Sequence, residues 1–129
     1  MSKAVFGSAY IDHVLGRVNV PGLDQLPLLL FNQIVSVLGE EIEFRAFFVG
    51  KGMKRFSFWP VAIAGAVLFA AAHYAAGAAG IVVWDLGGIF IDAILFAILY
   101  HRTGNCLISF VPHFLNNMIG FFLVPILFG

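Results

Sequence analysis

The chain has 129 residues, seven basic and seven acidic side chains, and a formal net charge of zero. This length suits one small domain, and the balanced charge argues against a nucleic-acid-binding protein, which would carry a basic stripe. Hydrophobic residues make up 61% of the chain, and a mean hydropathy of +0.99 indicates transmembrane helices. Cys106 is the one cysteine, so neither an intrachain disulfide nor a cysteine-based zinc site is expected.

Residues 1–25 mix charged and apolar side chains and lack the apolar core of a signal peptide. We expect them to form a non-spanning segment with a short amphipathic helix around Ala9 to Val18. Residues 26–129 then form the membrane domain. Helices are expected there at about 26–49, 59–76, 81–100 and 106–127.

The first of these helices can be capped by Asp24, and Pro27 is tolerated in its first turn. Each of the other helices has close to the roughly 20 apolar residues that cross a hydrocarbon core of about 30 Å. The predicted fold class is therefore all-α, as a polytopic membrane bundle of about four transmembrane helices.

Basic side chains lie in the loops after the first and third expected helices, at Lys51, Lys54, Arg55 and Arg102. The turn at residues 77–80 and the C-terminal tail carry no charge. By the positive-inside rule, the two basic loops face the cytoplasm and both chain termini lie on the opposite side.

The only three glutamates, Glu40, Glu41 and Glu43, lie within four positions of an apolar helix, followed by Arg45. Ionisable groups are costly in such a stretch and so indicate a functional site. Glu41 and Arg45 are four residues apart and can pair on one helix face. Glu40 points about 100° away from Glu41, has no evident partner, and can serve as a general base. The alternative is a cluster that ends the helix at a solvated interface.

Two later helices carry histidines. Phe69 lies one turn before His73 and can wall one side of its ring, although a lone histidine is often a core residue. His113 and Asn117 share one helix face beside Pro112, which can kink the helix; the alternative is hydrogen bonding between helices. At about 1.5 Å per residue, the glutamates and both histidines lie within about one turn of a common membrane level.

Asp92 lies in the middle of the third helix and needs an inward-facing partner. A structural polar contact is favoured over an extra acid at the site. His101 is expected to be an interfacial loop residue, and Cys106 a small apolar filler.

Three motifs, in order and each on an expected membrane helix, resemble those of the CPBP (Abi) membrane proteases. They are EExxxR at Glu40, Glu41 and Arg45, FxxxH at Phe69 and His73, and HxxxN at His113 and Asn117. The stretch from Tyr100 to Gly104 also looks like one that this family often carries before its last motif. The resemblance covers roughly residues 27–129. The family includes type II CAAX prenyl endopeptidases and bacterial relatives linked to bacteriocin processing, immunity and surface-protein sorting.

The resemblance implies a CPBP-like core and a glutamate-dependent intramembrane endopeptidase. Its substrate would be a protein or peptide, cleaved near its C-terminal or membrane-proximal part. Glu40 would activate water as the general base, and His73 would help to orient that water. His113 and Asn117 would stabilise the oxyanion of the tetrahedral intermediate.

The same resemblance gives supporting roles to three residues. Glu41 and Arg45 would hold the first helix in register, and Phe69 would pack behind the site. No cofactor is implied.

A zinc metalloprotease is one alternative, because Glu40, His73 and His113 could be three ligands of a zinc site with an open position. Against zinc, the ligands come from three helices rather than from HExxH. No acidic partner is evident for either histidine. A non-catalytic membrane binding or immunity protein is the other alternative.

Family members usually have more spanning helices, some of them before the EExxxR helix. The chain could thus be a minimal member, a truncated one or half of a split system. The expected partners are the lipid bilayer, a peptide or lipidated-protein substrate, and additional membrane helices from a partner or from self-association; nucleic acid is not expected. The expected location is the plasma or inner membrane, with the site reached from the cytoplasm.

Overall fold

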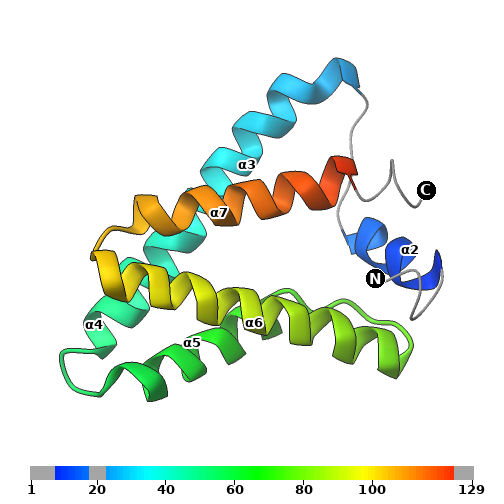
Figure 1. Cartoon of the computed structure of the whole chain (residues 1–129). Helices are drawn as coiled ribbons and strands as arrows, with labels where there is room; N and C mark the ends of the chain where they lie inside the picture. Colours follow the sequence, from blue (N-terminus) through cyan, green and yellow to red (C-terminus); the bar gives the residue numbers. More distant parts are fainter. Residues whose placement is uncertain (1–7, 18–22, 124–129) are drawn as a thin grey trace.

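The computed structural model describes residues 8–17 and 23–123, and within these ranges it contains helices and no strand (Figure 1). The elements are α2 (Ser8–Arg17), the 3₁₀-helix η1 (Leu23–Gln25), α3 (Leu26–Glu41), the π-helix η2 (Ile42–Val49), α4 (Gly50–Gly52), α5 (Phe58–Ala72), α6 (Ala79–Thr103), α7 (Cys106–Met118) and the π-helix η3 (Ile119–Leu123). The prediction of an all-α fold is confirmed for the described residues. The short helix expected near Ala9 is present as α2, and Val18 lies outside the described residues.

The segments α3, η2 and α4 follow one another without a break and correspond to the first expected helix. Pro27 lies in the first turn of α3, where proline is tolerated. The predicted cap by Asp24 is wrong, because Asp24 lies in η1 and the N-cap residue Gln25 makes no side-chain capping bond. Just after Glu41 the helix widens into η2, and π-segments occur frequently at functional sites.

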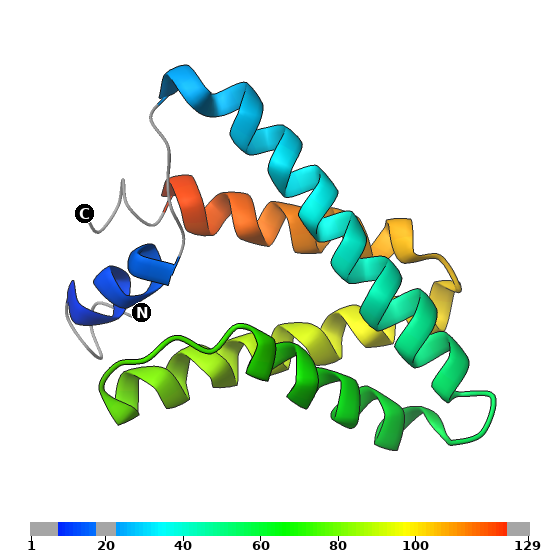
Figure 2. The same ribbon diagram turned by 180° about the vertical axis from the view of Figure 1, so that it is seen from behind.

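The helices α5 and α6 form an antiparallel pair (Figure 2). Small buried residues on both helices let them approach closely: Ala62, Ala66, Ala93 and Ala97. α5 ends at Ala72, four residues earlier than predicted, because His73 is its C-cap and residues 74–78 are irregular. The side chain of His73 bonds the carbonyl of Phe69, so it satisfies one of the backbone groups that a helix end leaves without a partner.

The helix α6 is longer than predicted at both ends, and Gly104 follows it with φ of 65°, the left-handed conformation that favours glycine after a helix. His101 therefore lies in the last turn of α6 rather than in a loop. Its ring stacks on Phe58 with centroids 4.4 Å apart, which places both basic loops at one end of the molecule. Asn105 then caps α7 by accepting a hydrogen bond from the backbone N–H of Leu107.

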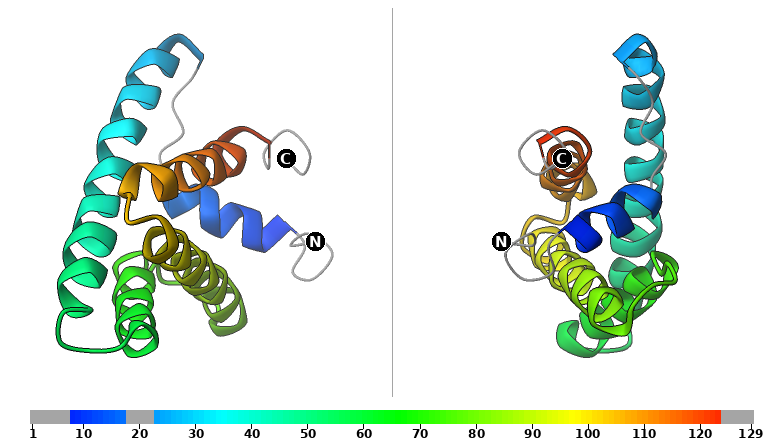
Figure 3. Two further views of the ribbon diagram at one scale, coloured as in Figure 1. Left: turned by 60° about the vertical axis from the view of Figure 1, so that its left-hand side comes forward. Right: turned by 90° about the vertical axis from the view of Figure 1, so that its right-hand side faces the viewer.

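The helix α7 packs against both α3 and α6 (Figure 1). The N-terminal half of α3 extends away from the α5–α6 pair (Figure 3). Large apolar side chains are exposed there, among them Leu28 and Phe31. The last expected helix is present as α7 and η3 up to Leu123, and residues 124–127 of that prediction lie outside the described residues.

Of the described helices, α6 alone is long and apolar enough to cross a membrane, with 25 residues and a mean hydropathy of 2.2 in its most apolar window. Only 22% of that window is buried inside the protein, as suits a helix that faces lipid. α5, with 15 residues, and the helical stretch Cys106–Phe122 are also apolar, but both are too short to count as full membrane spans. The expectation of a polytopic bundle with several full-length spans is therefore not confirmed.

Candidate active site

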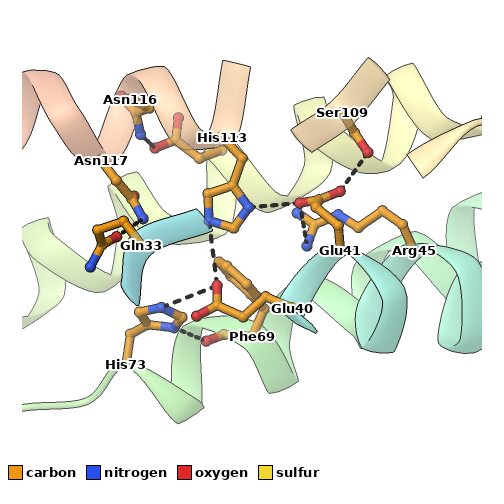
Figure 4. A network of polar contacts seen from close by, with 11 residues as sticks. Gln33, Glu40, Glu41, Arg45, Phe69, His73, Ser109, His113, Asn116 and Asn117 are labelled. Atoms are coloured by element: carbon orange, nitrogen blue, oxygen red, sulfur yellow. Dashed lines mark hydrogen bonds and ion pairs between the residues drawn. The ribbon is translucent and has the colours of Figure 1, made fainter. Parts of the chain in front are cut away.

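Three segments that are far apart in the chain meet at the carboxylate of Glu40 (Figure 4). Glu40 lies near the end of α3, and its Oε2 is 3.4 Å from Nε2 of His113 on α7. The same oxygen is 3.9 Å from Nε2 of His73 at the end of α5. These residues, which were predicted to lie at a common membrane level, are therefore close together in the fold. Glu40 keeps 27% of its side chain exposed, whereas its Oε2 is buried and makes no hydrogen bond to the described residues.

The ring of His73 has a fixed orientation. Its Nδ1 lies 2.7 Å from the carbonyl oxygen of Phe69, which can only accept, so Nδ1 carries the hydrogen and donates it. In a neutral ring, Nε2 is then free of hydrogen and faces Glu40. The Phe69 ring lies 4.5 Å from the imidazole, centroid to centroid, and walls one side of it as predicted.

His113 is held from the opposite side by Glu41. Its Nδ1 lies 2.6 Å from Oε1 of Glu41, and a carboxylate oxygen accepts, so Nδ1 donates a short, charge-assisted hydrogen bond. Ser109, four residues earlier on α7, donates its hydroxyl hydrogen to Oε2 of the same carboxylate. α7 therefore contacts both oxygens of Glu41, which is fully buried.

Arg45 balances this buried carboxylate. Its guanidinium lies 3.4 Å from Oε1 of Glu41, so the predicted pair is present. The guanidinium also lies over the rings of Phe69 and Phe96, at 4.9 Å and 5.2 Å from their centroids. Phe96 in turn stacks on His113 with centroids 4.8 Å apart. Two phenylalanines thus link the arginine to the histidines.

Asn117 lies one turn after His113 on α7 and donates from Nδ2 to Oε1 of Gln33 on α3, at 3.3 Å. Its neighbour Asn116 donates to Oδ2 of Asp92, at 2.9 Å. This contact supplies the partner that the sequence left unnamed for Asp92 and agrees with the structural role that we favoured.

The structure adds three residues that sequence reasoning missed: Gln33, Phe96 and Ser109. Ser109 carried a usable signal, because it shares a helix face with His113. Phe96 is one of fifteen phenylalanines, and no pattern marks it. The expectation that neither histidine has an acidic partner is wrong for His113, which bonds Glu41. Among the described residues, no three His, Cys, Asp or Glu side chains are grouped so as to hold a metal ion.

Comparison with protein families identifies the chain. The family model for type II CAAX prenyl endopeptidases of the Rce1-like kind matches residues 22–119. The chain belongs to the Rce1-like family. Searches among curated proteins and among solved structures gave no match. The matched span contains all three motifs, and membership in this membrane-embedded family implies a protease of the CAAX type.

Proposed function

We propose that this Rce1-like protein is a glutamate-dependent intramembrane endopeptidase. It would hydrolyse a peptide bond near the C-terminal or membrane-proximal part of a protein or peptide substrate. The observation that carries the proposal is the convergence of His73 and His113 on the carboxylate of Glu40, at 3.9 Å and 3.4 Å. A carboxylate beside two imidazoles in a largely apolar setting is suited to moving protons to and from a bound water.

In this mechanism Glu40 and His73 hold the attacking water. Two groups 3.9 Å apart can both lie within hydrogen-bond distance of one water oxygen. Glu40 takes a proton from the water, and the resulting hydroxide forms a bond to the carbonyl carbon of the substrate. Glu40 then gives the proton to the amide nitrogen as the C–N bond breaks. The products are a carboxylic acid, which keeps the second hydrogen of the water, and an amine.

His113 and Asn117 would stabilise the oxyanion that forms on the carbonyl oxygen. Nδ1 of His113 already donates to Glu41, so the ring must carry a second hydrogen on Nε2 to donate there as well. The carboxylates of Glu41 and Glu40 lie on the two sides of this ring. Asn117 uses one N–H on Gln33 and keeps a second for the substrate.

A zinc enzyme that uses the same residues is the second candidate. Each histidine bonds an oxygen acceptor through Nδ1 and turns Nε2 toward Glu40, as ligating histidines commonly do. We favour the metal-free mechanism because a Lewis acid would not need the amide of Asn117. Elemental analysis decides between them. One zinc per chain, with activity lost on chelation and restored by zinc, would establish the zinc enzyme.

The proposed setting is the plasma or inner membrane, with several membrane-crossing segments and a site reached from the cytoplasm. The bilayer, a peptide or lipidated substrate, and additional membrane helices from a partner or a second copy are the proposed partners. The exposed apolar face of α3 supports such partners.

A cleavage assay in membranes tests the proposed activity. Membranes with and without the protein are incubated with peptides that end in a C-a-a-X sequence, prenylated or not. A third peptide carries a membrane-proximal segment. Mass spectrometry of the products should show protein-dependent cleavage of at least one peptide, and the pattern identifies the substrate class. If all three peptides stay intact, the proposed activity is contradicted.

A further inference from the structure

Ser109 is fully buried on α7, and no step of the proposed mechanism uses it. Its oxygen contacts two acceptors, Oε2 of Glu41 and the carbonyl oxygen of Cys106, the latter at 3.1 Å. A hydroxyl has one hydrogen and can donate it to one acceptor at a time. A buried carboxylate is a stronger acceptor than a backbone carbonyl, so the hydroxyl donates its hydrogen to Glu41.

The two oxygens of Glu41 have different donors. Oε1 accepts a hydrogen bond from Nδ1 of His113 at 2.6 Å and lies 3.4 Å from the guanidinium of Arg45. Oε2 accepts a hydrogen bond from the hydroxyl of Ser109. Because the hydroxyl holds Oε2, the plane of the carboxylate cannot rotate freely about its last bond. Oε1 is thereby kept pointing at the imidazole.

The orientation of the His113 ring depends on this carboxylate. Stacking on Phe96 fixes the plane of the ring, with an interplanar angle of 19°. Stacking does not distinguish a ring from the same ring turned by a half rotation, which would replace the two nitrogens with carbons at nearly the same places. Two contacts select the orientation that turns Nε2 toward Glu40, and the hydrogen bond from Nδ1 to Glu41, at 2.6 Å, is shorter than the 3.4 Å contact of Nε2 with Glu40.

We propose that Ser109 is a positioning residue of the active site, which acts through Glu41 to keep Nε2 of His113 directed at Glu40. This inference rests on the proposed function of His113. Ser109 and His113 are four residues apart on α7, so one helix face contacts both oxygens of one carboxylate. A serine that served only to satisfy a buried carboxylate would affect stability but not the state of the imidazole.

The test compares purified wild type with Ser109→Ala, Ser109→Cys and Ser109→Thr. Alanine removes the donor, cysteine leaves a weak one, and threonine keeps the hydroxyl. Cys106→Ala, one turn away on α7, is the matched control. We expect Ser109→Ala to lower kcat about tenfold at unchanged KM, the low end for losing an outer partner of a functional histidine. Cysteine should lie in between, and threonine should restore activity.

The second readout is nuclear magnetic resonance of protein with ¹⁵N-labelled histidine. The Nδ1 hydrogen of His113 should give a downfield signal, typical of a short bond to a carboxylate, that shifts or broadens in Ser109→Ala and persists in Ser109→Thr. A signal and a kcat that match Cys106→Ala would overturn the inference. Loss of folding in both the alanine and cysteine variants would make Ser109 merely structural and would overturn it too. If the wild type cleaves no peptide, the proposed function fails, yet the signal still decides the role of Ser109.

Discussion

The Nδ1 atom of His113 lies 2.6 Å from Oε1 of Glu41, although the two residues are 72 positions apart in the chain. The Nε2 atom of the same ring lies 3.4 Å from Glu40, the residue before Glu41. One imidazole therefore lies between two adjacent glutamates with different surroundings. Glu41 is fully buried and bonds α7, while Glu40 is partly exposed beside both histidines.

The first prediction concerns Glu41. Glu41→Gln keeps an oxygen that can accept from His113 but removes the charge that balances buried Arg45. We expect the variant to be less stable by about 3 kcal/mol, as when one partner of a buried pair is lost. We also expect kcat per folded molecule to fall. Thermal unfolding in detergent measures the loss of stability. Steady-state kinetics, divided by the concentration of folded protein, measure the fall in kcat. If Glu41→Gln unfolds at the same temperature as wild type and has the same kcat, the charge of Glu41 is needed neither to balance Arg45 nor for catalysis.

The second prediction concerns the planar shape of Arg45. Arg45→Lys keeps the charge but loses the flat group that lies over Phe69 and Phe96. Arg45→Met loses the charge as well and leaves Glu41 without its ion pair. We expect the order of thermal stability to be wild type, lysine, methionine. A methionine variant as stable as wild type would mean that the arginine is dispensable for the fold.

The third prediction concerns the proposed oxyanion donor. Asn117→Ala should lower kcat on the order of 10², as for other lost oxyanion donors, with little effect on KM. Gln33→Ala should cost less, because Gln33 only holds the amide of Asn117 in place. Steady-state kinetics on the cleaved peptide give both values. A larger loss in Gln33→Ala than in Asn117→Ala would reverse these roles.

Contacts within one helix were predictable from spacing alone. Between helices, the sequence predicted that Glu40, His73 and His113 lie at a similar level, but not the individual contacts. The pairing of Glu41 with Arg45 and the contact of Phe69 with His73 follow from four-residue spacing, which is local geometry. The bond from Ser109 to Glu41 depends on how α7 is rotated against α3, and no spacing in the chain gives that angle.

The length of α5 was also missed. Its alanine-rich sequence favours a helix as far as Ala76, but the histidine at its end bonds the carbonyl of Phe69 and the chain turns before Gly77. Helix propensity alone therefore did not predict this end, where the His73 side chain bonds its own helix.

The fourth prediction concerns topology. A single cysteine placed at exposed Ser57 or Thr103, with Cys106 replaced by alanine, should react with a membrane-impermeant reagent only from the cytoplasmic side. The two sites lie at the end of the fold where Phe58 stacks on His101. Ala78→Cys, in the uncharged loop, should react only from the other side. The opposite labelling pattern would reverse the proposed orientation and the side from which substrate enters.

The most direct measurement is the rate of peptide cleavage by Glu40→Gln beside Glu43→Gln. Each variant replaces one carboxylate by an amide in the same short segment, but Glu43 is exposed and Glu40 faces His73 and His113. If Glu40 takes the proton from water, Glu40→Gln should lose at least about 10² in rate, while Glu43→Gln stays close to wild type. Equal cleavage by the two variants would contradict a glutamate-dependent mechanism centred on Glu40.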